Sequence, residues 1–316
     1  MPAAGRVQPA RTGGRVAVVN RGGRTAAGVA DRLAGARREH PEWRVWLDLF
    51  AAALVEDATR RWDSSLPLDG HHHRPDSAAP RLHDIELVVD GPPARRWVVR
   101  VLEMASRKRC TPDGGTSTAI LEAAIAQDEQ RLDQLSEALG VEAGVLRVAA
   151  QFAALPLLQA CRRAAEENAR AGWTMGYCPI CGAWPSLAEY LGLTRKRWLR
   201  CGRCGCSWEI EWLRCAFCGE ADHERLGYLT AEEREGGWKV EVCESCKGCL
   251  KAVAVVQAAA PADVFLEDLR TVHLDLAAME RGYRRPERVA FRLRVGVRAA
   301  ARGLFGTRPR GGNGGR

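Results

Sequence analysis

Eight of the twelve cysteines in this 316-residue chain fall into four Cys-x-x-Cys pairs. The pairs are Cys178/Cys181, Cys201/Cys204, Cys215/Cys218 and Cys243/Cys246. Each pair supplies two thiolates from one tight loop, and a tetrahedral metal ion needs four ligands. Glycine follows the second cysteine in three of the four pairs, where such a turn favours a positive φ. Four pairs therefore predict two metal sites.

The spacers between successive pairs are 19, 10 and 24 residues long. The two longer spacers fit a β-hairpin that returns the second pair of each site to the first. This favours a tandem arrangement, with Cys178, Cys181, Cys201 and Cys204 in site one and Cys215, Cys218, Cys243 and Cys246 in site two. An interleaved pairing stays open, and four thiolates suit Zn²⁺ and rubredoxin-type iron almost equally.

Other uses of these cysteines fit less well. Disulfides rarely persist in a reducing cytosol, and thiol redox chemistry favours an isolated Cys-x-x-Cys near a βαβ pattern, which the sequence lacks. Four protein ligands leave no open position for a substrate or an activated water, which argues against metal-centred hydrolysis. The sequence also lacks a Gly-rich cofactor loop and a nucleophile–base pair. We therefore expect a protein that is not an enzyme.

The net charge of +8 is concentrated in the two ends of the chain. Residues 284–316 hold ten Arg and one Glu, and residues 1–30 hold five Arg and no acidic residue, so residues 31–283 are net negative. We find no run of about eighteen apolar residues that predicts a membrane span and no secretory signal at the N-terminus. These features predict a cytoplasmic protein without a membrane span.

The pattern of elements predicts an α+β fold. Residues 1–27 are expected to be a disordered basic tail, and residues 28–172 a mostly helical domain, with a break at Pro41, an N-cap at Ser117 and a helix end at Gly140. Residues 173–256 hold the cysteine pairs. Residues 257–285 predict a C-terminal helix that packs on the body, and 286–316 an Arg/Gly-rich disordered tail.

The residues around the pairs resemble the FdhE family of formate dehydrogenase accessory proteins. The resemblance lies in "GYCPICGAWPSLA", "RWLRCGRCGCSWEIEWLRCAFCG", "VCESCKGCLKA" and "LRTVHLDLAAMERGY" and covers roughly residues 28–285. It implies tandem rubredoxin-like modules, favours iron over zinc in the two sites, and carries the metal-ligand role onto the eight paired cysteines. It also implies a non-catalytic assembly factor that binds the catalytic subunit of a molybdenum- or tungsten-dependent formate dehydrogenase.

A zinc-ribbon protein that binds nucleic acid is the alternative. It is motivated by "RKRWLRCGR", in which five basic residues surround Trp198. Residues 178–249, however, contain ten basic and eleven acidic residues, and each thiolate site adds further negative charge. We therefore expect a protein partner rather than nucleic acid. The expected contact surface comprises Trp184, Arg197, Trp198, Trp208 and Trp212.

Overall fold

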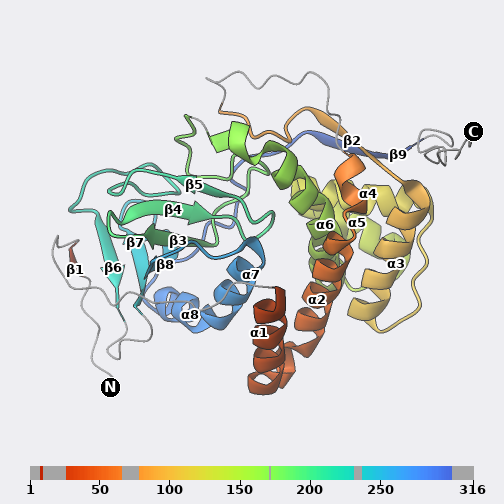
Figure 1. Cartoon of the computed structure of the whole chain (residues 1–316), viewed down its shortest axis with the longest axis horizontal. Helices are drawn as coiled ribbons and strands as arrows, with labels where there is room; N and C mark the ends of the chain where they lie inside the picture. Colours follow the sequence, from red (N-terminus) through yellow and green to blue (C-terminus); the bar gives the residue numbers. More distant parts are fainter. Residues whose placement is uncertain (1–7, 10–25, 66–77, 171, 231–236, 301–316) are drawn as a thin grey trace, which may run out of the picture.

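The computed structural model describes residues 8–9, 26–65, 78–170, 172–230 and 237–300. It combines a helical half with a half built on a seven-stranded sheet, and the two lie side by side along the long axis of the molecule (Figure 1). The α+β class and the order of a helical region before the cysteine modules agree with the sequence prediction.

The described residues between 26 and 170 supply the helical half. Its elements are α1 (Ala26–Glu39), η1 (Pro41–Trp43), α2 (Arg44–Ala58), η2 (Arg61–Ser65), β2 (Ile85–Val89), α3 (Gly91–Ser106), α4 (Gly114–Ala126), α5 (Glu129–Leu139) and α6 (Ala143–Arg170). The predicted break at Pro41 is confirmed, since α1 ends just before it. Gly140 ends α5 with φ +63°, as predicted.

The prediction of an N-cap at Ser117 is wrong. Asp113 caps α4 instead, and its side chain accepts a hydrogen bond from the amide of Thr116 at 2.7 Å. Ser117 is buried inside the helix, with its hydroxyl donating to the Asp113 carbonyl. Asp and Ser are both common N-cap residues, but Asp113 precedes the first turn, so its carboxylate reaches the free amide of Thr116.

The sheet half follows α6. Its strands are β3 (Leu187–Leu191), β4 (Lys196–Arg200), β5 (Ser207–Glu209), β6 (Leu226–Leu229), β7 (Trp238–Cys243) and β8 (Cys249–Val255), joined at one edge by the two-residue β1 (Gln8–Pro9). The order is β1-β6-β7-β8-β3-β4-β5. Two antiparallel hairpins, β3–β4 and β6–β7, return one cysteine pair to another, and the parallel pair β8–β3 joins the two modules.

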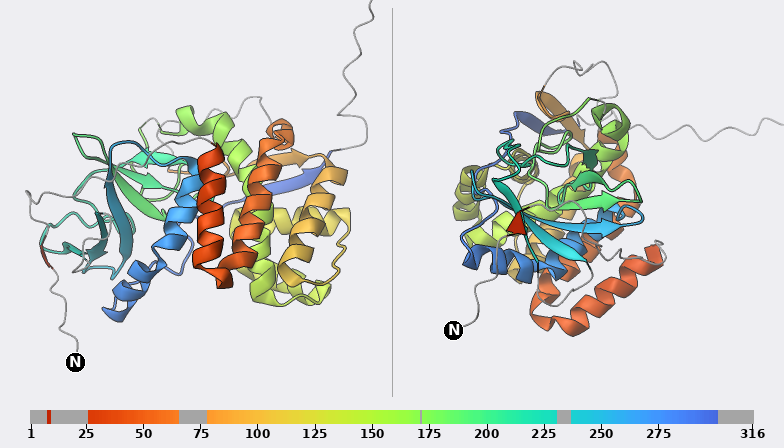
Figure 2. Two further views of the ribbon diagram at one scale, coloured as in Figure 1. Left: turned by 60° about the horizontal axis from the view of Figure 1, so that its bottom comes forward. Right: turned by 90° about the vertical axis from the view of Figure 1, so that its left-hand side faces the viewer.

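The segment after the sheet forms two helices, α7 (Pro261–Arg270) and α8 (Val272–Glu280), rather than one. They cover one face of the sheet (Figures 1 and 2). Helical spacing across this segment places Val272, Leu276 and Met279 on the same apolar face as Leu266 and predicts that they pack on the body, but these three side chains are exposed. The chain changes direction at Thr271. The three side chains on α8 therefore do not continue the buried face of α7 to which Leu266 belongs.

Residues 286–300 differ from the predicted disordered tail. They include β9 (Val295–Ala299), which pairs in parallel with β2, five residues against five. Leu293 and Val297 lie in the main core, and Arg294 forms an ion pair with Asp84 at 2.7 Å. The arginine-rich composition of this segment led to the prediction of disorder, although the segment contains a short strand with alternating apolar residues. The rest of the predicted tail, residues 301–316, lies outside the described residues, as does most of the predicted N-terminal tail.

One helix in the described part of the chain is long and apolar enough to cross a membrane by composition alone. It is Ala143–Glu166 within α6, with a mean hydropathy of 1.4 over eighteen residues, which the sequence reading missed. In the structure, 72% of this eighteen-residue apolar stretch is buried. The apolar residues of α6 therefore serve the core, where Leu146, Leu157 and Cys161 are almost fully enclosed.

Candidate metal centres

The four Cys-x-x-Cys turns share one backbone pattern. In each, the amide of the first cysteine donates to the carbonyl five residues later: Cys178 to Ala183, Cys201 to Cys206, Cys215 to Glu220 and Cys243 to Gly248, all at 2.8–3.0 Å. The residue after the second cysteine has a positive φ in every turn: Gly182 at +67°, Gly205 at +78°, Gly219 at +79° and Lys247 at +56°. The glycine signal therefore located three turns, and the fourth forms with a lysine in the left-handed region.

Site one lies where the β3–β4 hairpin meets the loop after α6. Cys178 Sγ is 3.5 Å from Cys204 Sγ, and Cys181 Sγ is 3.5 Å from Cys201 Sγ. All four side chains are fully buried, and they belong to the main hydrophobic core. The helical half therefore shields site one from solvent.

Site two lies at the end of the β6–β7 hairpin. Cys215 Sγ is 3.7 Å from Cys246 Sγ, and Cys218 Sγ is 3.7 Å from Cys243 Sγ. Cys215 and Cys243 are buried, whereas Cys218 and Cys246 are exposed. The structure thus groups the eight cysteines in the tandem arrangement, and site two is the more accessible.

Both groups fit a tetrahedral metal ion. The four sulfurs of each group lie within 4.8 Å of one another. Metal–sulfur bonds of about 2.3 Å place neighbouring sulfurs of a tetrahedron about 3.8 Å apart, close to the 3.5–3.7 Å found between the turns. A disulfide requires about 2.05 Å, and all eight thiols are free. Each group can therefore hold one metal ion.

The electrostatics of site one disfavour four thiolates in the absence of a cation. Burial raises the pKa of the Cys178 and Cys204 thiols well above the ordinary value, while hydrogen bonds from the neighbouring thiols hold the pKa of Cys201 well below it. Without a cation, four thiolates in one buried space repel one another. A divalent or trivalent ion supplies the missing positive charge.

The basic stretch that suggested nucleic-acid binding is used inside the protein. Arg197 is buried, and its guanidinium contacts the Glu241 carboxylate at 2.6 Å. Arg200 is buried against Glu189 and donates to the Ala259 carbonyl at 2.6 Å. These side chains join strands of the sheet and are withdrawn from solvent.

Two more members of the stretch are also engaged. Arg203 donates to Gln151 at 3.0 Å, which ties the second cysteine turn to α6. Lys196 is exposed but forms an ion pair with Glu209 at 3.0 Å. Arg197, Arg200 and Arg203 therefore form internal links, whereas Arg195 and Lys196 lie at the surface.

Some tryptophans of the predicted contact surface also contact other parts of the protein. Trp208 is fully buried, and its indole donates to the Met175 carbonyl at 3.1 Å. Trp184 donates to the Arg288 carbonyl at 2.9 Å and lies edge-on to Phe217. Trp212 is half exposed. Of the tryptophans proposed for contact, Trp212 is thus the most available.

Comparison with known proteins identifies the relatives of this arrangement. Residues 213–291 match the family described as FdhE, C-terminal domain. Over 120 residues the chain is 31% identical to a Protein FdhE homolog of Aquifex aeolicus, covering 37% of this chain and 41% of the relative. Residues 213–291 therefore carry the C-terminal domain of the FdhE family. A Protein FdhE homolog of Pseudomonas aeruginosa is 31% identical over 117 residues.

The fold agrees with the family assignment over a longer stretch. The crystal structure of the FdhE protein from Pseudomonas aeruginosa covers 83% of this chain and 93% of that chain, with a TM-score of 0.53 and 21% identity. The sequence alignments span about two fifths of the length of the FdhE relatives, 41% and 37%. The FdhE resemblance on the cysteine turns is therefore confirmed, and the shared fold extends into the helical half.

Proposed function

We propose that the protein is a non-catalytic assembly factor that binds the catalytic subunit of a molybdenum- or tungsten-dependent formate dehydrogenase in the cytoplasm. The FdhE C-terminal domain supports an accessory role for formate dehydrogenase. The two four-thiol groups support binding rather than catalysis, because each supplies all four positions around an ion from the protein. The eight paired cysteines would be the ligands, with iron favoured by the resemblance and zinc the alternative.

The observation that carries this proposal is the position of the two thiol groups. Each sits at the end of a hairpin, and site one connects the hairpin to the helical half through a shared core. Bound ions would lock the modules into one surface without presenting an open coordination position. A rigid surface of this kind suits recognition of another protein.

Nucleic-acid binding loses its main support from the described residues. Arg197 and Arg200 are buried in ion pairs, and Lys196 is paired at the surface. Phosphate recognition requires cations that are free to displace counterions. Within the stretch Arg195 is exposed, so this alternative would have to rest on it and on residues outside the cysteine modules.

A gene deletion tests the proposed function. Deletion should abolish formate dehydrogenase activity in the cell extract while leaving the transcript of the catalytic subunit unchanged. The wild-type gene in trans should restore activity, and a Cys178→Ser/Cys243→Ser copy, expressed to the same level, should not. Full activity in the deletion strain would refute an assembly role.

A further inference from the structure

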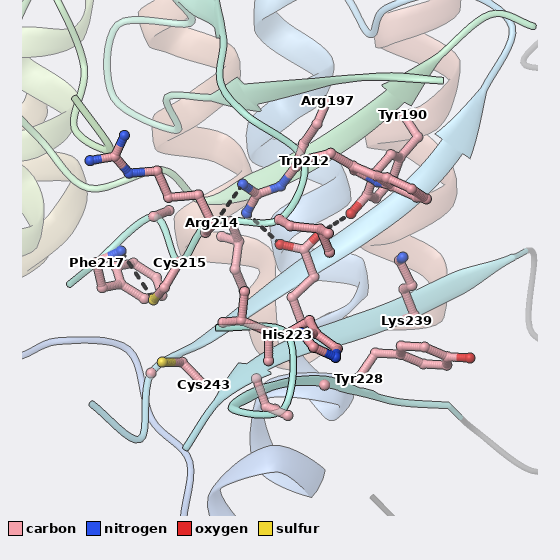
Figure 3. Close-up of a pocket in the computed structure, with 18 residues that line it drawn as sticks. Tyr190, Arg197, Trp212, Arg214, Cys215, Phe217, His223, Tyr228, Lys239 and Cys243 are labelled. Atoms are coloured by element: carbon pink, nitrogen blue, oxygen red, sulfur yellow. Dashed lines mark hydrogen bonds and ion pairs between the residues drawn. The ribbon is translucent and has the colours of Figure 1, made fainter. Parts of the chain in front are cut away.

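A cavity of about 310 Å³ lies on the face of the sheet opposite α7 and α8. The strand register places Tyr228, Glu241 and Leu250 in one row across β6, β7 and β8, and Tyr190 and Arg197 in another row across β3 and β4. Alternate residues of a strand share a face. The side chains of these rows form the floor and walls of the cavity, and Trp212 lies over Tyr190 (Figure 3).

Of the lysine and arginines that line this cavity, Arg197 and Arg214 pair with carboxylates of described residues and Lys239 does not. Its Nζ lies 4.3 Å from the centre of the Tyr190 ring and 5.3 Å from that of Tyr228. It forms no ion pair within 4.0 Å of any residue that the structure describes. Burial lowers the pKa of this amine. A half-buried ammonium between aromatic rings favours an anionic partner.

The nearest carboxylate is already engaged. Glu241 accepts a hydrogen bond from Arg197 at 2.6 Å and another from the Tyr190 hydroxyl. Its charge attracts Lys239 through space, but its oxygens are held by the other two side chains. The cavity therefore has room and attraction for one more carboxylate beside Lys239.

The cavity opens next to a sheet edge. β6 pairs with β7 on one side, and on the other side Gln8 and Pro9 lie opposite Tyr228 and Gly227. Proline has no N–H to donate, so this two-residue pairing is weak. Among the described residues, Leu226 and Leu229 have no strand partner on that side. A peptide that displaces this short pairing can bind β6 through main-chain hydrogen bonds.

A strand added to β6 lies close enough to Lys239 for one of its side chains to contact the ammonium group. Neighbouring strands lie about 4.8 Å apart, so a strand added to β6 lies about 10 Å from β7. This distance is within the combined reach of a lysine and a glutamate side chain. Trp212 and Leu213, both substantially exposed at the rim, offer apolar contact to the residues beside the carboxylate.

We propose that the cavity and β6 bind an extended segment of another protein, which takes the place of the two-residue β1 and pairs an acidic side chain with Lys239. This peptide site rests on the proposed function in one respect, that the protein acts by binding a protein partner. It assigns the contact to one face of the sheet and to one chemical feature of the partner.

A randomised pool of blocked six-residue peptides tests the site without assuming a client. The pool is passed over the immobilised full-length protein, and retained peptides are sequenced by mass spectrometry. Asp and Glu should be enriched about fivefold or more over the input. Lys239→Met should abolish this enrichment, and Lys239→Glu should replace it with enrichment of Lys and Arg.

Lys196→Met is the matched control, since Lys196 lies on the same sheet but outside the cavity and is already paired with Glu209. This variant should retain the acidic preference. Equal metal content and thermal unfolding of all variants show that folding is intact. An acidic preference that is absent from the wild-type protein, or that survives in Lys239→Met, would overturn the proposal.

Strand addition is tested with the most enriched peptide. N-methylation of alternate amides should weaken its binding at least tenfold in one of the two registers, because only one register donates to β6. Equal binding of both methylated forms and the parent would show that no strand is added. Recovery of a formate dehydrogenase subunit without any acidic preference would refute this site alone, whereas acidic preference without that subunit would refute the client.

Discussion

The two thiol groups differ in exposure, and this difference predicts unequal metal release. The sulfurs of site one are fully buried in the core, whereas Cys218 and Cys246 of site two are exposed. A chelator should therefore remove one ion quickly and the second only on unfolding. The measurement is a colorimetric chelator assay with time. Release of both ions in a single fast phase would contradict the assignment.

Substitution of single ligands should separate the sites. Cys178→Ser and Cys246→Ser should each lower the metal content from two ions per chain to one, but Cys178→Ser should lower the melting temperature much more, because its site lies in the shared core. Cys110→Ser is the control, since Cys110 is a buried thiol outside both groups. Elemental analysis and calorimetry would detect the difference. Unchanged metal content in both ligand variants would rule out these cysteines as ligands.

Arg200 forms a buried ion pair with Glu189, so its substitution should strongly lower the free energy of unfolding. Removing one partner of a buried ion pair costs about 3–5 kcal/mol, whereas an exposed pair contributes about 0–1 kcal/mol. Arg200→Met should therefore lower the free energy of unfolding several-fold more than Lys196→Met, which loses only the exposed contact with Glu209. Denaturant unfolding measures both. Equal, small effects of both substitutions would contradict a buried ion pair and would leave Arg200 available to bind nucleic acid.

Local sequence signals located the cysteine groups because a Cys-x-x-Cys turn is specified within six residues. The burial and the partners of Arg197 and Arg200 could not be predicted from local sequence. Their partners, Glu241 and the Ala259 carbonyl, lie 44 and 59 residues away and are brought near by sheet pairing. Lys239 was missed for the same reason, since its surroundings come from β3 and β6.

At the scale of elements, an ionic cluster holds α7 and α8 to the sheet. Lys251 on β8 contacts Asp268 at 2.8 Å and Asp275 at 2.7 Å, and Arg285 contacts the same two carboxylates. Burial raises the pKa of Asp268, but attraction to Arg285 and Lys251 outweighs it and lowers the pKa below 3.8. The cluster therefore stabilises the helices mainly while Asp268 is ionised.

This depressed pKa predicts a pH-dependent effect of Arg285→Met. A carboxyl group whose native pKa is lowered contributes stability that is complete above its unfolded pKa of about 3.9 and is lost as the pH falls through the native value. The difference in unfolding free energy between wild type and Arg285→Met should be constant above about pH 5 and shrink below pH 4. Arg281→Met, which loses an exposed contact to a carbonyl, should show a small pH-independent difference. A difference that grows in acid would contradict the cluster.

Strand β9 predicts where the chain tolerates truncation. Ending the chain after Arg285 removes Leu293 and Val297 from the core and leaves β2 without its partner. This truncation should lower the melting temperature by several degrees, whereas ending the chain after Ala300 retains β9 and should leave it unchanged. Equal melting of both forms would show that β9 contributes nothing. The sequence concealed this strand because Arg292, Arg294 and Arg298 lie in and beside it, and because the strand forms only by pairing with β2, more than 200 residues away.

At the scale of the whole molecule, one core runs through both halves. Cys178 and Cys201 from the sheet half and Leu146 and Leu157 from α6 belong to the same cluster of buried residues. The division at residue 173 that the composition suggested stays a prediction about domains, but loss of site one should disturb the helical half as well. Site one lies inside this shared core, whereas the more exposed site two and the Lys239 cavity lie on the sheet half.

Recovery of the client tests the central claim most directly. The protein is produced in its own host with an affinity tag and purified in the presence of nuclease, beside a Lys239→Met variant and an untagged control. The account predicts that the catalytic subunit of a formate dehydrogenase is recovered with the wild-type protein and not with the untagged control. Recovery of no such subunit, together with binding of RNA or DNA that weakens steeply with salt, would contradict it.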